Sequence, residues 1–261
     1  MNIDFGMKTV RVKIRQSSKK IMDDVVARHL PNVSSNNKSK VEICVFCGTQ
    51  ENLTKEHVLP RWTFGKSTED FFITDTNISE QSYNKTTIPA CAECNNSRLA
   101  SIENYIISIF KNTNLKENFF DKNEIQNIIR WLEIIEYKFQ ILEIRRKFIK
   151  TKAVPTISFF RDIPISVMRK NIEYSPRKAI AEIRYSQKRI AIKDKSLNEN
   201  SLVIFNTKNE SFYFFHHLND FIYLELPEFK IALFYFYNRT FNNSKEGYEE
   251  AMKIIESVYN T

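Results

Sequence analysis

Four cysteines, all that the 261-residue chain contains, occur as two C-x-x-C pairs. Cys44 and Cys47 form the first pair, and Cys91 and Cys94 form the second. Four thiolates in such pairs are the usual closed ligand set of a structural zinc ion, and Gly48 after the first pair suits the positive φ of a ligand loop. Two redox-active or unrelated thiol pairs are the alternative, but no cysteine is left over. The sequence therefore predicts a structural Zn²⁺ site.

An acid and an imidazole stand side by side between the cysteine pairs, in "KEHVLPRW" (55–62). An amide directly follows the last cysteine in "CAECNN" (91–96). The order C-x-x-C-G, acid-His-x-x-Pro and then C-x-x-C-N opening a helix resembles the HNH endonucleases, specifically their zinc-stapled members with a ββα-metal site. The resemblance covers about residues 41–103, a quarter of the chain.

The resemblance implies a role for each of these side chains. His57 would be the general base, because an imidazole can take a proton from water near neutral pH. Glu56 and Asn95 would hold one Mg²⁺ or Mn²⁺ ion through oxygen atoms, and that ion would stabilise charge on the scissile phosphate. Asn96 is an alternative to Asn95 as the ligand. The alternative for His57 is an ordinary half-buried histidine in a non-catalytic zinc module.

This chain departs from the family pattern in three places. Glu56 stands where the family more often has Asp, the separation of His57 from Cys91 implies an inserted loop over 63–85, and Asn84 is the nearest match to the family's middle Asn. Neighbouring residues on a regular strand also point to opposite faces. Glu56 and His57 can therefore share a site only if the backbone near Pro60 is irregular.

Positive charge is concentrated outside the cysteine segment. The formal net charge is +8 with a pI near 9.2, and residues 145–195 carry fifteen basic against four acidic residues, whereas 41–103 is net acidic. Phosphate contacts would give sequence-tolerant affinity for DNA. The alternatives are a solvated face or a dock for an acidic partner protein. The residues predicted to contact nucleic acid are Arg145, Arg146, Lys147, Lys188, Arg189 and Lys193.

Several classes of protein are disfavoured by what the sequence lacks. No apolar run approaches the roughly 18–20 residues that span a bilayer, and neither G-x-G-x-x-G nor G-x-x-x-x-G-K-[ST] occurs, so we expect no nucleotide cofactor. The first residues have no signal-peptide pattern. We therefore expect a cytoplasmic location, where thiols stay reduced.

The N-terminal half must position the cysteine segment, and its periodicity is mainly helical. We expect a strand over 7–15, a helix over 18–30 with Ser18 as its cap, and a polar linker over 32–40. Helices are predicted over 99–112 and 122–149, and Asp121 with Glu124 forms the capping box of the second. The apolar stripe of that helix is read as core.

From residue 153 the sequence changes to short β-prone runs between polar turns. "AVPTISFF" (153–160), a hairpin within 179–193 and four later runs between 201 and 238 are the predicted strands, followed by a helix over 245–259. His216 and His217 are expected to be structural, His29 partly buried, and Trp62 packed beneath the site.

The predicted fold class is α+β: a zinc-stapled ββα module with a helix and antiparallel-sheet accessory region. The expected divisions are an arm and linker over 1–40, a nuclease module over 41–112 and an accessory domain over 113–261. The predicted function is metal-dependent hydrolysis of DNA phosphodiester bonds, in phage defence, restriction or a mobile element. RNA as the substrate and a regulatory protein partner stay open. The alternative is a non-catalytic, zinc-stabilised module that binds nucleic acid or protein.

Overall fold

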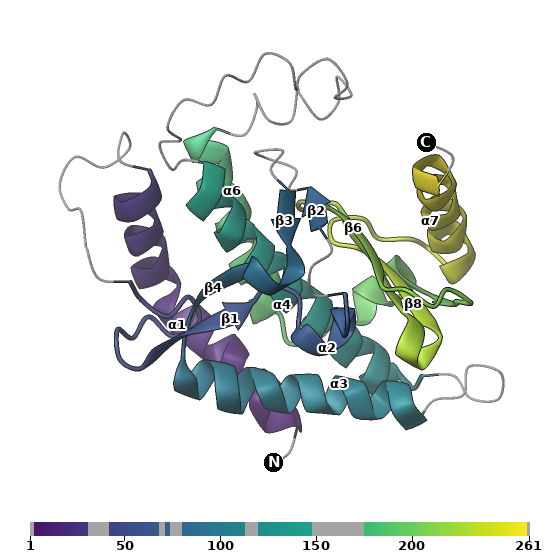
Figure 1. Cartoon of the computed structure of the whole chain (residues 1–261), viewed down its shortest axis with the longest axis horizontal. Helices are drawn as coiled ribbons and strands as arrows, with labels where there is room; N and C mark the ends of the chain where they lie inside the picture. Colours follow the sequence, from purple (N-terminus) through teal and green to yellow (C-terminus); the bar gives the residue numbers. More distant parts are fainter. Residues whose placement is uncertain are drawn as a thin grey trace.

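The computed structural model describes residues 3–30, 42–67, 71–73, 80–112, 120–147 and 175–259. It is a mixed α+β structure in which helix α4 (Lys122–Lys147) runs through the middle (Figure 1). Helices α1 (Ile3–His29), α3 (Ala100–Asn112) and α6 (Pro176–Ala191) pack against α4. Residues 131–144 of α4 are buried without interruption, as expected for a helix that has neighbours on all sides.

The start of α4 follows from local sequence. The Glu124 N–H donates to Asp121 Oδ1 and the Asp121 N–H donates to Glu124 Oε2, both at 2.8 Å. The two residues therefore satisfy two N-terminal donors reciprocally, and the predicted capping box is confirmed. The apolar stripe predicted as core is confirmed as well, because Ile128, Leu132 and Phe139 are buried.

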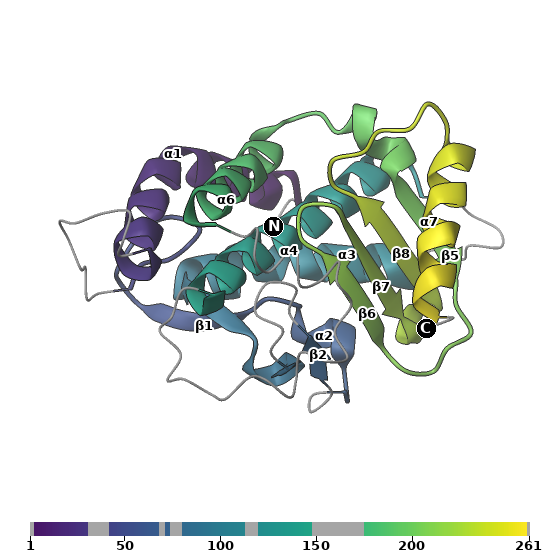
Figure 2. The same cartoon turned by 90° about the horizontal axis from the view of Figure 1, so that it is seen from above.

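A four-stranded antiparallel sheet in the order β5-β8-β7-β6 packs against the middle of α4. Its strands are β5 (Leu202–Asn206), β6 (Tyr213–His217), β7 (Phe221–Leu226) and β8 (Ile231–Phe236). One face packs toward α4, and the other packs against α7 (Ser244–Tyr259) through a separate apolar cluster that includes Phe234, Phe236 and Ala251 (Figure 2). The four predicted runs and the final helix are thus confirmed.

Two predictions of strand structure are wrong. Residues 7–15 belong to α1, with Ser18 inside it, because Val10, Ile14 and Ile21 are buried at helical spacing. The supposed hairpin over 179–193 lies mostly in α6. The hydroxyl of Ser175 accepts from the Lys178 N–H at 3.2 Å and proline follows the cap, which are the two signals of a helix start.

The remaining elements are short. Strands β1 (Leu53–His57) and β4 (Thr87–Cys91) pair with each other, as do β2 (Phe71–Ile73) and β3 (Glu80–Ser82). The short helical segments are α2 (Arg61–Phe64), η1 (Tyr83–Lys85), η2 (Glu93–Leu99), η4 (Ser196–Ser201) and η5 (Pro227–Phe229). The predicted linker over 32–40 and the run over 153–160 lie outside the described residues. No helix in the described part of the chain is long and apolar enough to cross a membrane.

Candidate metal centre and the strand beside it

The four cysteines meet at one point. Their sulfur atoms all lie within 4.8 Å of one another, and the Cys47 and Cys91 sulfurs are 3.6 Å apart. Cys44, Cys91 and Cys94 are buried, and Cys47 is partly exposed. Zinc bound by four thiolates at about 2.3 Å requires this tetrahedral spacing. The cluster therefore fits a structural Zn²⁺ ion, and within the described residues it is the one group of cysteine, histidine and acidic ligand atoms that fits a metal.

The first cysteine loop is a tight turn that depends on a glycine. The Gly48 N–H donates to the Cys44 carbonyl at 2.8 Å, and the Cys44 N–H donates to the Thr49 carbonyl at 2.7 Å. Gly48 has a φ of 72°, where a side chain is strained. The Val45 N–H also donates to the Pro89 carbonyl at 3.1 Å. This bond fixes the first pair beside β4, which leads into the second pair.

Close contact between the thiols affects their protonation. Contacts with Cys44 and Cys47 raise the pKa of the Cys94 thiol, and burial raises it further. The contact with Cys44 lowers the pKa of Cys47, so one thiolate forms at the expense of its neighbours. Arg98 Nη1 lies 3.0 Å from the Cys94 sulfur. A divalent cation would allow the sulfurs to ionise together.

Strands β1 and β4 pair with each other, and β4 leads directly into a helical segment. The pairing is antiparallel and regular, with Leu53 opposite Cys91 and His57 opposite Thr87. After Cys91 the chain enters η2, a π-helical segment, and continues as α3. Such wide turns are frequent at functional sites. The cysteines thus hold both ends of this unit: the strand pair and the start of the helix.

His57 lies at the end of β1 and is half-buried. Its ring packs on Phe64, with the ring centroids 6.2 Å apart. Within the described part of the chain its imidazole has no hydrogen-bond partner, so both ring nitrogens are available to a ligand. Trp62 packs on Trp131, with ring centroids 5.4 Å apart.

Asn95 is oriented by β1. Its Nδ2 donates to Thr54 Oγ1 at 2.9 Å and to the Lys55 carbonyl at 3.3 Å. The Val58 N–H donates to the Thr86 carbonyl on the side of β1 that faces β4. Because the backbone groups of successive residues point to alternate sides of a strand, the Lys55 carbonyl faces away from β4. Both bonds use the amide nitrogen, so the Oδ1 atom is left for another partner. Asn96, the alternative ligand, is exposed.

Glu56 points away from solvent into a cluster of charges. Its side chain is 7% exposed and forms an ion pair with the ammonium of Lys138, which is 1% exposed. Lys138 Nζ also donates to the His57 carbonyl at 3.1 Å and lies 3.8 Å from Glu103 Oε1. Burial raises the pKa of Glu103 to about 7, with the charge of Glu56 contributing and that of Lys138 opposing.

This cluster does not fit the role that the resemblance implies for Glu56 and Asn95, which is to bind one divalent cation together. Because β1 is regular, Glu56 and His57 point to opposite faces. One carboxylate oxygen of Glu56 is already bound by Lys138, and a metal ion there would face an adjacent positive charge. Glu56 and Asn95 have no hydrogen-bond partner in common among the described residues. Nothing in this geometry brings the two together as ligands of one ion.

The basic residues predicted to contact nucleic acid do not form one surface. Arg189 is buried and donates to Asn219 at 2.6 Å and to Asn238 at 2.9 Å, so it is a structural residue. Arg145 forms a 2.7 Å ion pair with Glu42. Lys188 and Lys193 are exposed. Arg146 and Lys147 end α4, and their side chains lie outside the described part.

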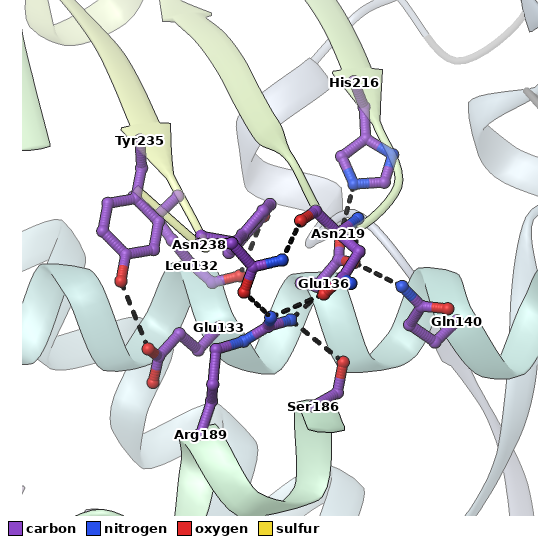
Figure 3. A network of polar contacts seen from close by, with 11 residues as sticks. Leu132, Glu133, Glu136, Gln140, Ser186, Arg189, His216, Asn219, Tyr235 and Asn238 are labelled. Carbon is purple, nitrogen blue, oxygen red and sulfur yellow. Dashed lines mark hydrogen bonds and ion pairs between the residues drawn. The ribbon is translucent and has the colours of Figure 1, made fainter. Parts of the chain in front are cut away.

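A second polar network surrounds Arg189 (Figure 3). Glu136 on α4 lies 2.5 Å from His216 Nε2 and accepts from the Asn219 N–H at 2.7 Å. Burial opposes the ionisation of Glu136, but His216 and Arg189 outweigh it and lower its pKa. His216 also stacks on Phe139 at 4.5 Å. The prediction that His216 is structural agrees with these contacts.

Lys138 and Glu103 were missed from the sequence, although they determine what surrounds Glu56. From the sequence, only the apolar stripe of α4 was assigned a role, whereas the helix is buried on all sides over 131–144.

Comparison with models of protein families, with curated proteins and with solved structures finds no match to this chain.

Proposed function

We propose that this protein is an endonuclease of the HNH type that hydrolyses phosphodiester bonds in DNA. One observation carries the proposal. The cysteine cluster holds a β-β-helix unit in which the amide of Asn95 is hydrogen-bonded to Thr54 and Lys55, on the strand that ends at His57. The combination of an imidazole with free nitrogens and an amide with a free oxygen suits proton transfer at a polar substrate.

In the proposed reaction, His57 accepts a proton from a water molecule as the water oxygen bonds to phosphorus. The bond between phosphorus and the 3′-oxygen breaks, and the 3′-oxygen takes a proton from solvent, which leaves a 5′-phosphate and a 3′-hydroxyl. Among the described residues the imidazole has no hydrogen-bond partner and one aromatic contact, with Phe64, and His57 is only half-buried. HNH nucleases use a divalent ion to polarise the phosphate. Because Glu56 is bound by Lys138, we assign no step to such an ion and no ligand role to Glu56.

The test is nicking of supercoiled plasmid with Mg²⁺, with Mn²⁺ and with EDTA. We expect cutting by the wild-type protein and a loss of about 100-fold or more for His57→Ala, the usual scale for removing a general base. His217→Ala is the matched control, because His217 is a partly exposed histidine on β6. Equal cutting by His57→Ala and wild type would overturn the proposal.

A second candidate is a zinc-stabilised module that binds nucleic acid without cutting it. The Glu56–Lys138 ion pair favours this candidate, because it uses the acid that the family employs as a metal ligand. The two candidates differ in one result. A folded, zinc-loaded protein that binds DNA but nicks no plasmid with any divalent ion supports the binding module.

A further inference from the structure

Two hollows, of about 540 Å³ and about 420 Å³, lie along helix α1 on the side that faces α4 and α6. The first lies between α1, the start of α4 and the residues after α6, and the second lies between α1 and α6. Helices α1 and α6 are side by side in both views of the molecule (Figures 1 and 2). We call these two hollows the α1 furrow.

Four basic residues of α1 line the furrow in sequence order. Lys8 and Arg11 line the first hollow, and Arg15 and Lys19 line the second. Spacings of three and four residues place side chains on one face of a helix. At 1.5 Å per residue the four span about 16 Å. One wall of the furrow is therefore a continuous row of positive charge.

The opposite wall is basic as well. Arg184 and Lys188 of α6 face the second hollow, and Lys193, beyond the end of α6, faces the first. The start of α6 thus lies toward the end of α1, and the two helices run antiparallel. Lys122 and Arg130 of α4 complete the first hollow. Of the charged residues that line the two hollows, nine are basic and Asp23 and Asp194 are acidic.

Few acids in the described structure neutralise this charge. Lys8, Arg15, Lys19, Arg184 and Lys188 are exposed, and none of them has an ion pair with a described residue. Lys122 lies 3.8 Å from Glu199, with its side chain 66% exposed. A concave surface lined by one sign of charge focuses the field and attracts a polyanion. The furrow thus has the charge and the shape for an elongated anionic ligand.

We propose that the α1 furrow binds the phosphodiester backbone of a nucleic acid. A row of about 16 Å matches the length of duplex axis over which one strand carries about five phosphates, at 3.4 Å of axis each, whereas a small anion would occupy only part of it. The proposal goes beyond hydrolysis, since binding here requires no chemistry at His57.

The test removes three exposed charges of the furrow together, in the variant Arg15→Ala/Lys19→Ala/Lys188→Ala. The matched control is Lys208→Ala/Lys245→Ala/Lys253→Ala, which removes the same charge from exposed lysines elsewhere. Affinity for a fluorescent 20-base-pair DNA duplex is measured by anisotropy in EDTA at several salt concentrations. Without divalent ions, cutting cannot affect the result, so failure of this proposal is separate from failure of the nuclease.

We expect the furrow variant to bind at least about tenfold more weakly, with the slope of log K against log salt reduced by about 2–3, near 0.9 per lost phosphate contact. The control should bind like wild type, and both variants should melt like wild type. The same affinity measurement with single-stranded DNA and with duplex RNA identifies the kind of nucleic acid that the furrow prefers. Unchanged affinity and slope in the furrow variant would overturn the proposal, and so would binding of polyglutamate without binding of any nucleic acid.

Discussion

Lys138 forms an ion pair with Glu56 in a region where both side chains are almost fully buried. The same ammonium donates to the carbonyl of His57 at 3.1 Å, so a single residue of α4 fixes the last two residues of β1. The pair joins the central helix to the strand that carries the proposed base. Its cost of desolvation must be met by good geometry, because water cannot solvate either charge.

Breaking this pair on one side should destabilise the protein strongly. Lys138→Met leaves Glu56 charged and unpaired, and we expect a loss of about 3–5 kcal/mol in the free energy of unfolding. The double variant Lys138→Met/Glu56→Leu should recover most of that loss, because no charge stays buried alone. Urea denaturation measures both, with exposed Lys66→Met as a control near zero. A single variant as stable as wild type would show that the pair is not formed.

Glu103 should make stability fall as the pH rises. Burial raises its pKa from 4.5 to about 7 in the folded protein, so the folded state binds the proton more tightly than the unfolded state. This contribution is fully present below pH 4.5 and is lost as the pH rises through about 7. Relative to Glu103→Gln, wild type should lose about 2–3 kcal/mol across that window. Parallel stability curves for the two proteins would contradict the assignment.

Zinc should be necessary for the cooperative fold. We expect one zinc per chain by elemental analysis. The Cys91→Ser variant and the chelated protein should lose both the zinc and the cooperative thermal transition, because the energy of binding at a structural site is folding energy. A zinc-free protein that melts like wild type would contradict this.

Arg98→Ala should keep the fold but bind zinc about 10–100-fold more weakly, since Arg98 contacts the Cys94 sulfur. Lys55→Ala, exposed on β1, is the control.

Arg189 and Lys188 are neighbours on α6 with opposite roles. Arg189→Ala removes the ion pair with Glu136 and leaves the side-chain oxygens of Asn219 and Asn238 without their buried donor, and we expect a loss of about 2–4 kcal/mol in stability. Lys188→Ala, at an exposed position, should change stability by less than about 0.5 kcal/mol. Denaturant titration of the two variants checks the contrast. Equal losses would mean that Arg189 is not held by the network.

Local signals predicted local structure well. The capping box of Asp121 and Glu124 needs only residues that are close in sequence, and it is formed. Each C-x-x-C pair is local as well, and the ligand chemistry of four thiolates was enough to predict that the two distant pairs meet. The strand over 7–15 and the hairpin over 179–193 were wrong because short alternating runs of Ile and Val fit a strand as well as one turn of a buried helix. The Ser175 cap would have decided the second case.

Contacts between residues far apart in the sequence could not be predicted from local patterns. The alternation of β1 already indicated that Glu56 and His57 point to opposite faces, but the partner of Glu56 lies on a helix 82 residues away. Arg189 was grouped with its basic neighbours because charge counts take no account of burial. Its position on the inner face of α6 follows only once the helix is recognised.

The position of Lys138 determines where this chain can be cut. A fragment of residues 41–112, the predicted nuclease module, would contain the cysteines, Glu56, His57 and Asn95, but not the lysine that neutralises the acid. It would also lack Tyr137, whose hydroxyl donates to the Val45 carbonyl at 2.6 Å within the first cysteine loop. Without α4, this segment would expose the apolar residues that pack on that helix and leave the Glu56 carboxylate without its partner. A fragment that folds therefore has to extend through α4.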